Sequence, residues 1–300
     1  MTALALTALA VVLSMLAPVP LSRFRPLEEV PGAAVALWQC VALAAALAAV
    51  GAALAAPEEI LRGLHGGRVP LGPALFVGAG LALVLAGVIV VRLAVVTARL
   101  AWNTRRRRRR QLEMLDLLEG AARERSRLHV LAARLPLAYC IPGRPGRVVL
   151  TEATLDLLTP AETDAVVAHE LAHLRARHDL VVEAFTALHI AFPQFVRSRL
   201  ALESVNRLLE MLADDAATRH RDPAPLHSAL TKLAATAEAG EEVGARLGRL
   251  RRRLSGRTPR RTRLRLLTVG TYTLGIAVLA VPTVAIVTPW LQAALGALPW

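Results

Sequence analysis

Two histidines and a glutamate stand close together in the chain, in the run His169-Glu170-Leu171-Ala172-His173. Since an α-helix has 3.6 residues per turn, His169 and His173 face the same way and can offer two imidazoles to one metal ion. Glu170 then lies about 100° round the helix, beside the metal ion. The pattern predicts one catalytic Zn²⁺ per chain, which activates a water molecule, and Glu170 as the general base.

The alternative is an ordinary surface helix that carries two histidines. Its neighbours Val166, Val167 and Leu174 are apolar, so the helix is expected to be half buried. A glutamate between two histidines needs a partner in such surroundings, because burying a lone charge is costly. The zinc interpretation is therefore favoured.

A catalytic zinc needs a third protein ligand. The helix expected over 200–220 carries Glu210 and Asp214, which are four residues apart and so share one face. Glu210 is the predicted third ligand, and Asp214 is predicted to hold the second ring nitrogen of a zinc histidine. The alternative is that they are solvated acids on an amphipathic helix, as expected for Glu203 and Asp215.

Residues closer to His173 offer weaker third ligands. Asp179 stands where some HExxH patterns place the last ligand, but Ala176 replaces their glycine. A helix that continues without a turn points Asp179 away from the two histidines. His178 is one residue out of register. Two further candidates have no supporting pattern: Glu183 and His189.

The beginning of the metal-binding helix is marked by Thr159, Pro160 and Glu162. Thr159 is a good N-cap, proline suits the first helical position, and Glu162 completes a capping box. The helix is expected to run to about His178. An earlier helix is expected over 111–135, where leucines alternate with charged residues.

Two short strands are predicted before the metal-binding helix, at 138–141 and 147–151, with a glycine and proline turn between them. If the second strand lies at a sheet edge, its free backbone groups can pair with an extended substrate. The alternative is an internal strand that only packs the domain. The candidates for this substrate strand are Val148, Val149 and Leu150.

Four apolar stretches are long enough to cross a membrane, which takes about 20 residues. They cover residues 2–20, 33–56, 71–98 and 266–290. The first could instead be a cleaved signal peptide, but no basic residue precedes it. The sequence therefore predicts an integral membrane protein.

Arginines beside the spans predict their orientation, because basic flanks stay in the cytoplasm. Such flanks follow the first span, follow the third as the run Arg105–Arg110, and precede the fourth. All three basic flanks lie on one side of the membrane if the N-terminus is outside, and this orientation is predicted. The predicted location is the plasma membrane. The predicted parts are three spans in 1–98, a cytoplasmic domain in 99–265, a fourth span in 266–290 and an external tail in 291–300.

The net charge is +13, nearly all from arginine. Because Arg105–Arg110 directly follows a span, it is predicted to bind anionic lipid headgroups of the bilayer. No direct nucleic-acid partner is predicted, since no recognition motif is present and only 4% of residues are aromatic. The two cysteines, Cys40 and Cys140, are expected in different compartments without a disulfide or a zinc-thiolate role.

Three stretches of the chain resemble the BlaR/MecR-type membrane zinc metallopeptidases (metallopeptidase family 56), relatives of the HtpX-like gluzincins. They are RVVLTEATLDLLTPAETDAVVAHE, the HELAH run with the following LRARHDL, and EMLAD at 210–214. The resemblance covers about 138–220. It implies zinc ligation by His169, His173 and Glu210, general-base catalysis by Glu170, support of a ligand by Asp214, and a strand beside the cleft.

These features predict a mainly α, four-span integral membrane protein with a cytoplasmic α+β zincin-like (gluzincin) peptidase domain. The expected function is a zinc-dependent endopeptidase for cytoplasmic or membrane-adjacent proteins, either in signalling on a transcriptional repressor or in membrane quality control. Antibiotic-sensing members carry a penicillin-binding domain after the last span, and only a few residues follow Pro289, so no β-lactam sensor is expected. The alternative is a catalytically silent membrane signalling or scaffold protein, which has no need of Glu170.

Overall fold

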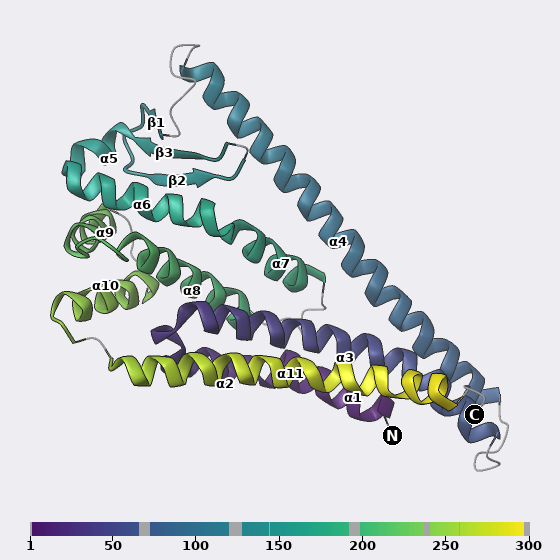
Figure 1. Ribbon diagram of the computed structural model, residues 1–300. Helices are drawn as coiled ribbons and strands as arrows, with labels where there is room; N and C mark the ends of the chain where they lie inside the picture. Colours follow the sequence, from purple (N-terminus) through teal and green to yellow (C-terminus); the bar gives the residue numbers. More distant parts are fainter. Residues whose placement is uncertain are drawn as a thin grey trace. The chain divides into compact units, whose positions relative to one another are not determined.

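The computed structural model describes residues 2–65, 73–119, 128–143, 145–191, 199–236, 241–257 and 259–296. Within these residues the chain is mainly helical and forms a three-stranded sheet (Figure 1). It divides into two compact units. Unit 1 comprises 1–98, 185–204 and 265–300, and unit 2 comprises 99–184 and 205–264.

Unit 1 contains the most apolar helices. They are α1 (Thr2–Val11), η1 (Val12–Leu16), α2 (Pro18–Arg23), η2 (Arg25–Glu29), α3 (Pro31–His65), the first part of α4 (Pro73–Glu119) and most of α11 (Arg261–Gly296). Three stretches are long and apolar enough to cross a membrane: Ala3–Arg23, Pro31–Ala55 and Arg261–Thr288. They agree with three of the four predicted spans.

The predicted span at 71–98 begins outside the described residues, and several of its side chains also lie outside them. The backbone is helical from Pro73 onward, in α4. A fourth membrane crossing therefore stays a prediction.

Small residues bring the helices of unit 1 together. Ala48 and Ala52 of α3 are buried beside Leu6 of α1. A Cβ atom on Gly275 of α11 would lie only 3.3 Å from Cys40 Sγ of α3. Such close packing is typical of membrane helices, whose association in lipid depends on van der Waals contact. Large apolar side chains of α11 are exposed instead, among them Leu266, Ile276 and Val284.

Unit 2 holds the sheet and the helices that surround it. Its elements are the end of α4, β1 (Leu128–Leu131), β2 (Ala138–Ile141), β3 (Arg147–Thr151), α5 (Glu152–Leu157), α6 (Pro160–Ala176), the start of α7 (His178–Ala191), most of α8 (Arg199–Ala217), α9 (Ala224–Thr236) and α10 (Glu241–Leu254). The strands predicted at 138–141 and 147–151 are confirmed as β2 and β3.

The helix predicted over 111–135 is wrong in its second half. Helix α4 ends at Glu119, and Leu128–Leu131 forms β1, which pairs in parallel with β3. Pairing with a buried strand decides the conformation of such a short apolar segment, because β-structure depends more on sheet neighbours than on local preference.

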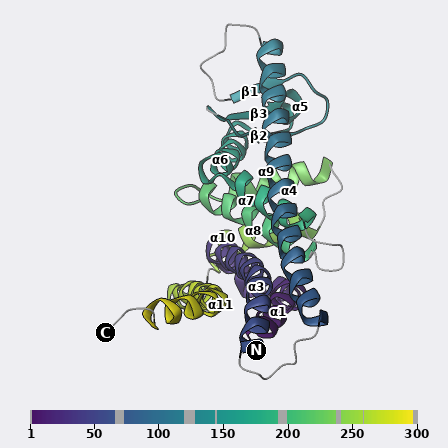
Figure 2. The same ribbon diagram turned by 90° about the vertical axis from the view of Figure 1, so that its right-hand side faces the viewer.

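The sheet order is β1-β3-β2, so β3 is the central strand. Val149 faces His129 of β1 and Tyr139 of β2, and both neighbours pair with β3 along its length. The prediction that Val148, Val149 and Leu150 form a free edge is therefore wrong. The backbone N–H and C=O groups of a central strand form hydrogen bonds with its two neighbouring strands, so they are not free to bind a substrate. Strand β2 is an edge of this sheet, and it lies next to α6 in both views (Figures 1 and 2).

Helix α6 is held between the sheet and helix α9, and α10 packs on α9. Val166 packs with Leu150 of β3 and Ala229 of α9. The predicted capping box is confirmed at the start of α6, with Thr159 and Glu162 exchanging hydrogen bonds. The helix ends at Ala176, slightly earlier than predicted, because the next residue adopts a left-handed conformation.

Candidate metal centre

Two helices of unit 2 bring three potential metal ligands together. Helix α6 supplies His169 and His173 one turn apart, and α8 supplies Glu210. The two Nε2 atoms are 3.2 Å apart. Oε2 of Glu210 lies 3.3 Å from Nε2 of His169, and Oε1 of Glu210 lies 3.4 Å from Nε2 of His173. Among the described residues, these three form the group of side chains that could hold a metal ion.

These separations fit a zinc ion. Zinc in proteins binds nitrogen and oxygen at about 2.0–2.2 Å in a tetrahedral arrangement, whose ligand atoms are then about 3.3–3.5 Å apart. Two imidazoles and one carboxylate are also a ligand set of catalytic zinc sites, which leave the fourth position open. The residues therefore fit the ion in both donor type and spacing.

Other side chains hold the imidazole rings in place. Asp214 Oδ1 lies 2.9 Å from Nδ1 of His169, which favours a proton on Nδ1 and leaves Nε2 as the ligand atom. His178 Nδ1 lies 3.0 Å from Nδ1 of His173. Asp214 and His178 are both buried. Both histidines thus turn Nε2 toward the shared site.

Arg246 of α10 contacts two acids of α8, Glu210 and Asp214. Its guanidinium donates to the Asp214 carboxylate at 2.9 and 2.8 Å and lies 2.7 Å from Oε2 of Glu210. Arg249 and Arg253 follow on the same helix and bind Asp215 instead. Arg246 is buried and keeps the two carboxylates in place. The sequence prediction missed this residue, since nothing local links α10 to α8.

The electrostatics of the three ligands favour a cation between them. Burial alone would lower the pKa of His169, but hydrogen bonds to Asp214 and Glu210 raise it to about 9. Burial would raise the pKa of Glu210, yet His169 and Arg246 hold it at about 2. Burial lowers the pKa of His173 to about 4, so this imidazole is neutral. A metal ion can take the place of the proton on His169.

Glu170 lies beside the three ligands and next to Cys140 of β2. Burial raises the pKa of Glu170, and the nearby Glu210 carboxylate adds to the effect. Burial and Glu170 raise the pKa of the Cys140 thiol to about 12, so the thiol stays protonated and donates to the Glu170 carboxylate. Both cysteines are free. The contact between Cys140 and Glu170 was not predicted from the sequence.

The weaker third-ligand candidates lie elsewhere. Asp179 and Glu183 interact with Arg108 of α4, at 3.0 and 3.9 Å. His178 holds His173 and does not join the group of three. His189 belongs to unit 1.

The site has the features of a zinc metallopeptidase, and comparison with known proteins supports this class. Residues 101–217, which include α6 and the acids of α8, match Peptidase family M48. Over 120 residues the chain is 34% identical to "Plastoglobule-localized metallopeptidase 48, chloroplastic" of Arabidopsis thaliana, which covers 36% of this chain and 34% of that protein. The match thus spans about a third of the relative's length. No solved structure matches the chain.

These findings show that residues 101–217 are similar to Peptidase family M48, and that part of the chain is similar to a protein named as a metallopeptidase. They do not show the narrower resemblance to the BlaR/MecR type of family 56, which was expected from the sequence.

Proposed function

We propose that this protein is an integral membrane, zinc-dependent endopeptidase of cytoplasmic or membrane-adjacent proteins. The observation that carries the proposal is the convergence of His169, His173 and Glu210, with Glu170 at their side. A silent scaffold has no use for a half-buried glutamate next to a complete ligand set.

The proposed roles follow from the contacts of each residue. His169, His173 and Glu210 hold the zinc, while Asp214 and His178 orient the rings. A bound zinc polarises the substrate carbonyl and makes water a nucleophile at neutral pH. Glu170 accepts a proton from the attacking water and returns it to the leaving amine. Its raised pKa suits this exchange, because a base is most effective when its pKa is near the working pH.

The proposed substrate lies along β2. An edge strand offers free backbone groups to an extended peptide, and β2 is the edge that neighbours α6. Cys140 on this strand contacts Glu170, which brings β2 beside the catalytic residue. Backbone pairing of this kind accepts many sequences, so selectivity would come from side-chain pockets.

The proposed location is the plasma membrane, with residues 99–265 in the cytoplasm. Three helices suited to crossing a membrane and the arginine-rich flanks support this arrangement. Within the metallopeptidases we favour a BlaR/MecR-like role, in cleavage of a transcriptional repressor or in membrane quality control.

The test compares the wild-type chain with Glu170→Gln, and with Glu203→Gln as a matched control on an exposed glutamate. Purified full-length protein should cleave an unfolded model protein, and Glu170→Gln should not. In the native host, quantitative proteomics should show cytoplasmic or membrane proteins that accumulate only in the Glu170→Gln strain. Equal proteomes and no cleavage by the zinc-loaded wild type would favour the silent scaffold.

A further inference from the structure

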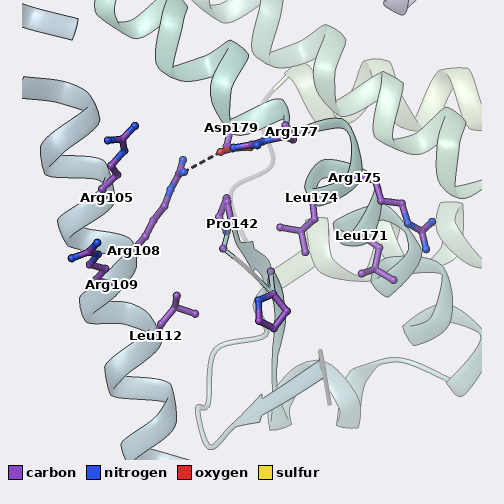
Figure 3. A pocket seen from close by; sticks show the side chains of 13 residues that line it. Arg105, Arg108, Arg109, Leu112, Pro142, Leu171, Leu174, Arg175, Arg177 and Asp179 are labelled. Carbon is purple, nitrogen blue, oxygen red and sulfur yellow. Dashed lines mark ion pairs between the residues drawn. The ribbon is translucent and has the colours of Figure 1, made fainter. Parts of the chain in front are cut away.

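Unit 2 contains a cavity of about 980 Å³ between the end of α4, the β2–β3 turn and the end of α6 (Figure 3). This volume is at the upper end of the range of small-ligand pockets, about 300–1,000 Å³. None of the proposed zinc ligands lines it, and neither does Glu170. Five arginines line this cavity, which we call the arginine cavity: Arg105, Arg108 and Arg109 from α4, with Arg175 and Arg177 from the end of α6.

The arginine cavity has a large excess of positive charge. Among the described lining residues Asp179 is the acidic one, so five arginines against one aspartate leave four positive charges unbalanced. Arg108 reaches across from α4 and pairs with Asp179 at 3.0 Å, as the dashed line in Figure 3 shows. The four other arginines make no ion pair with any residue in the described part of the chain: Arg105, Arg109, Arg175 and Arg177.

Backbone strain adds a second observation. Arg177 has φ 52° and is the described non-glycine residue with positive φ. Glycine is the usual residue at such a left-handed helix end, because a side chain costs stability there. The chain nevertheless places an arginine at this point, where it lines the cavity. A strained residue of this kind is a common sign of a functional constraint.

Arginines that converge without carboxylate partners fit a phosphate group. The guanidinium fork binds phosphate oxygens in pairs, and several such groups together neutralise its charge. The apolar neighbours Leu112, Leu171 and Leu174 suit the carbon atoms next to the phosphate of a phospholipid. Arg105 follows the predicted span at 71–98 by about 10 Å at 1.5 Å per residue, a distance comparable to the thickness of the headgroup layer.

We propose that the arginine cavity is a binding site for a phosphate group, carried by the headgroup of an anionic phospholipid. This site differs from attraction between the Arg105–Arg110 run and a charged membrane surface. It needs Arg175 and Arg177 from α6, and it uses only part of the run. It does not depend on the proposed peptidase activity.

The run supplies its own matched control. Arg105 and Arg109 line the cavity, whereas Arg106 and Arg110 are also exposed but do not line it. The full-length chain in neutral detergent is titrated with phosphatidylglycerol, and bound lipid is counted by native mass spectrometry. The double variant Arg105→Gln/Arg109→Gln should lose about 30-fold in affinity, and Arg106→Gln/Arg110→Gln less than about threefold.

Arg177→Gly separates binding from stability. It should weaken lipid binding severalfold while leaving the melting temperature unchanged or higher, because glycine removes the strain. Phosphatidylcholine should not bind at the cavity. A parallel titration with glycerol 3-phosphate identifies the source of the phosphate: weak binding of this soluble compound supports the lipid, and equally tight binding supports a free phosphate ligand. Equal losses for both double variants, or unchanged binding by Arg177→Gly, would overturn the proposal.

Discussion

Helix α6 carries two buried polar clusters that differ in how completely they are satisfied. At its beginning, Glu162 accepts hydrogen bonds from Thr159 N at 2.8 Å, Ser228 Oγ at 2.5 Å and Lys232 Nζ at 2.7 Å. Lys232 is the chain's single lysine. Every contact of this carboxylate is therefore a donor that the chain itself provides.

About two turns further along α6, the second cluster brings potential metal ligands together without such a set of donors. The side chains of His169, His173 and Glu210 turn toward one another: the two Nε2 atoms are 3.2 Å apart, and the Glu210 oxygens lie 3.3 Å from Nε2 of His169 and 3.4 Å from Nε2 of His173. The donors that the chain provides here are Arg246, which pairs with Asp214 and with Oε2 of Glu210, and the protons of the imidazole rings. The first cluster therefore stabilises the fold, whereas the second groups three side chains that could hold a metal ion.

Loss of Glu170, which lies beside the second cluster, should have the largest effect, because the proposed reaction needs this residue as its general base. Glu170→Gln should lower kcat by about 10²–10⁴-fold and leave the zinc content unchanged. Asp164→Asn, on an exposed face of α6, is the control and should be near wild type. If Glu170→Gln loses zinc, Glu170 is a metal ligand, and its assignment as the general base is wrong.

Arg246→Met should weaken zinc binding by about 10–100-fold, the usual effect of removing support from a ligand. Arg249→Met is the matched control, since Arg249 on the same helix binds Asp215 rather than the site. Chelator competition measures the zinc Kd of both variants. Equal losses would mean that α10 acts only through packing on α8.

Glu162→Gln should lower the free energy of unfolding by about 1–2 kcal/mol at pH 7 and leave zinc in place. Burial would raise the pKa of Glu162, but hydrogen bonds from Lys232 and Ser228 hold it at about 2, below its ordinary 4.5. The stabilisation is therefore complete above pH 4.5 and disappears as the pH falls toward 2.

Urea titrations of both chains in detergent, from pH 7 to pH 3, measure this difference. A gap between the two chains that grows as the pH falls would contradict the assigned direction of the pKa shift.

Cys140→Ala should have the smallest effect, a loss of about two- to fivefold in kcat with zinc retained, because one hydrogen bond to Glu170 disappears. Cys40→Ala, in unit 1, should leave kcat unchanged. A loss of zinc on removing Cys140 would show that the thiol is a ligand.

Short-range features could be predicted from the sequence, since each depends on residues close together in the chain. The spacing of His169 and His173 placed both on one face of α6, and Thr159 with Glu162 marked its first turn. The two strands on either side of the glycine and proline turn were placed at the correct residues.

Long-range features could not be predicted in the same way. The central position of β3 depends on β1, and the pattern of 111–135 favoured a helix there. The contact of Arg246 with Glu210 requires α10 to pack on α8, and no periodicity shows which helices pack together. The left-handed turn at Arg177 was also hidden, because arginine rarely adopts it.

X-ray absorption at the zinc K edge tests the metal centre most directly. Purified wild-type protein should hold about one zinc per chain, with two imidazole nitrogens and carboxylate oxygen at about 2.0–2.2 Å. Glu210→Ala should lose most of the zinc or exchange its carboxylate for solvent, while Glu203→Ala keeps the wild-type spectrum. A spectrum without imidazole scattering, or one that Glu210→Ala leaves unchanged, would contradict the proposed centre of His169, His173 and Glu210.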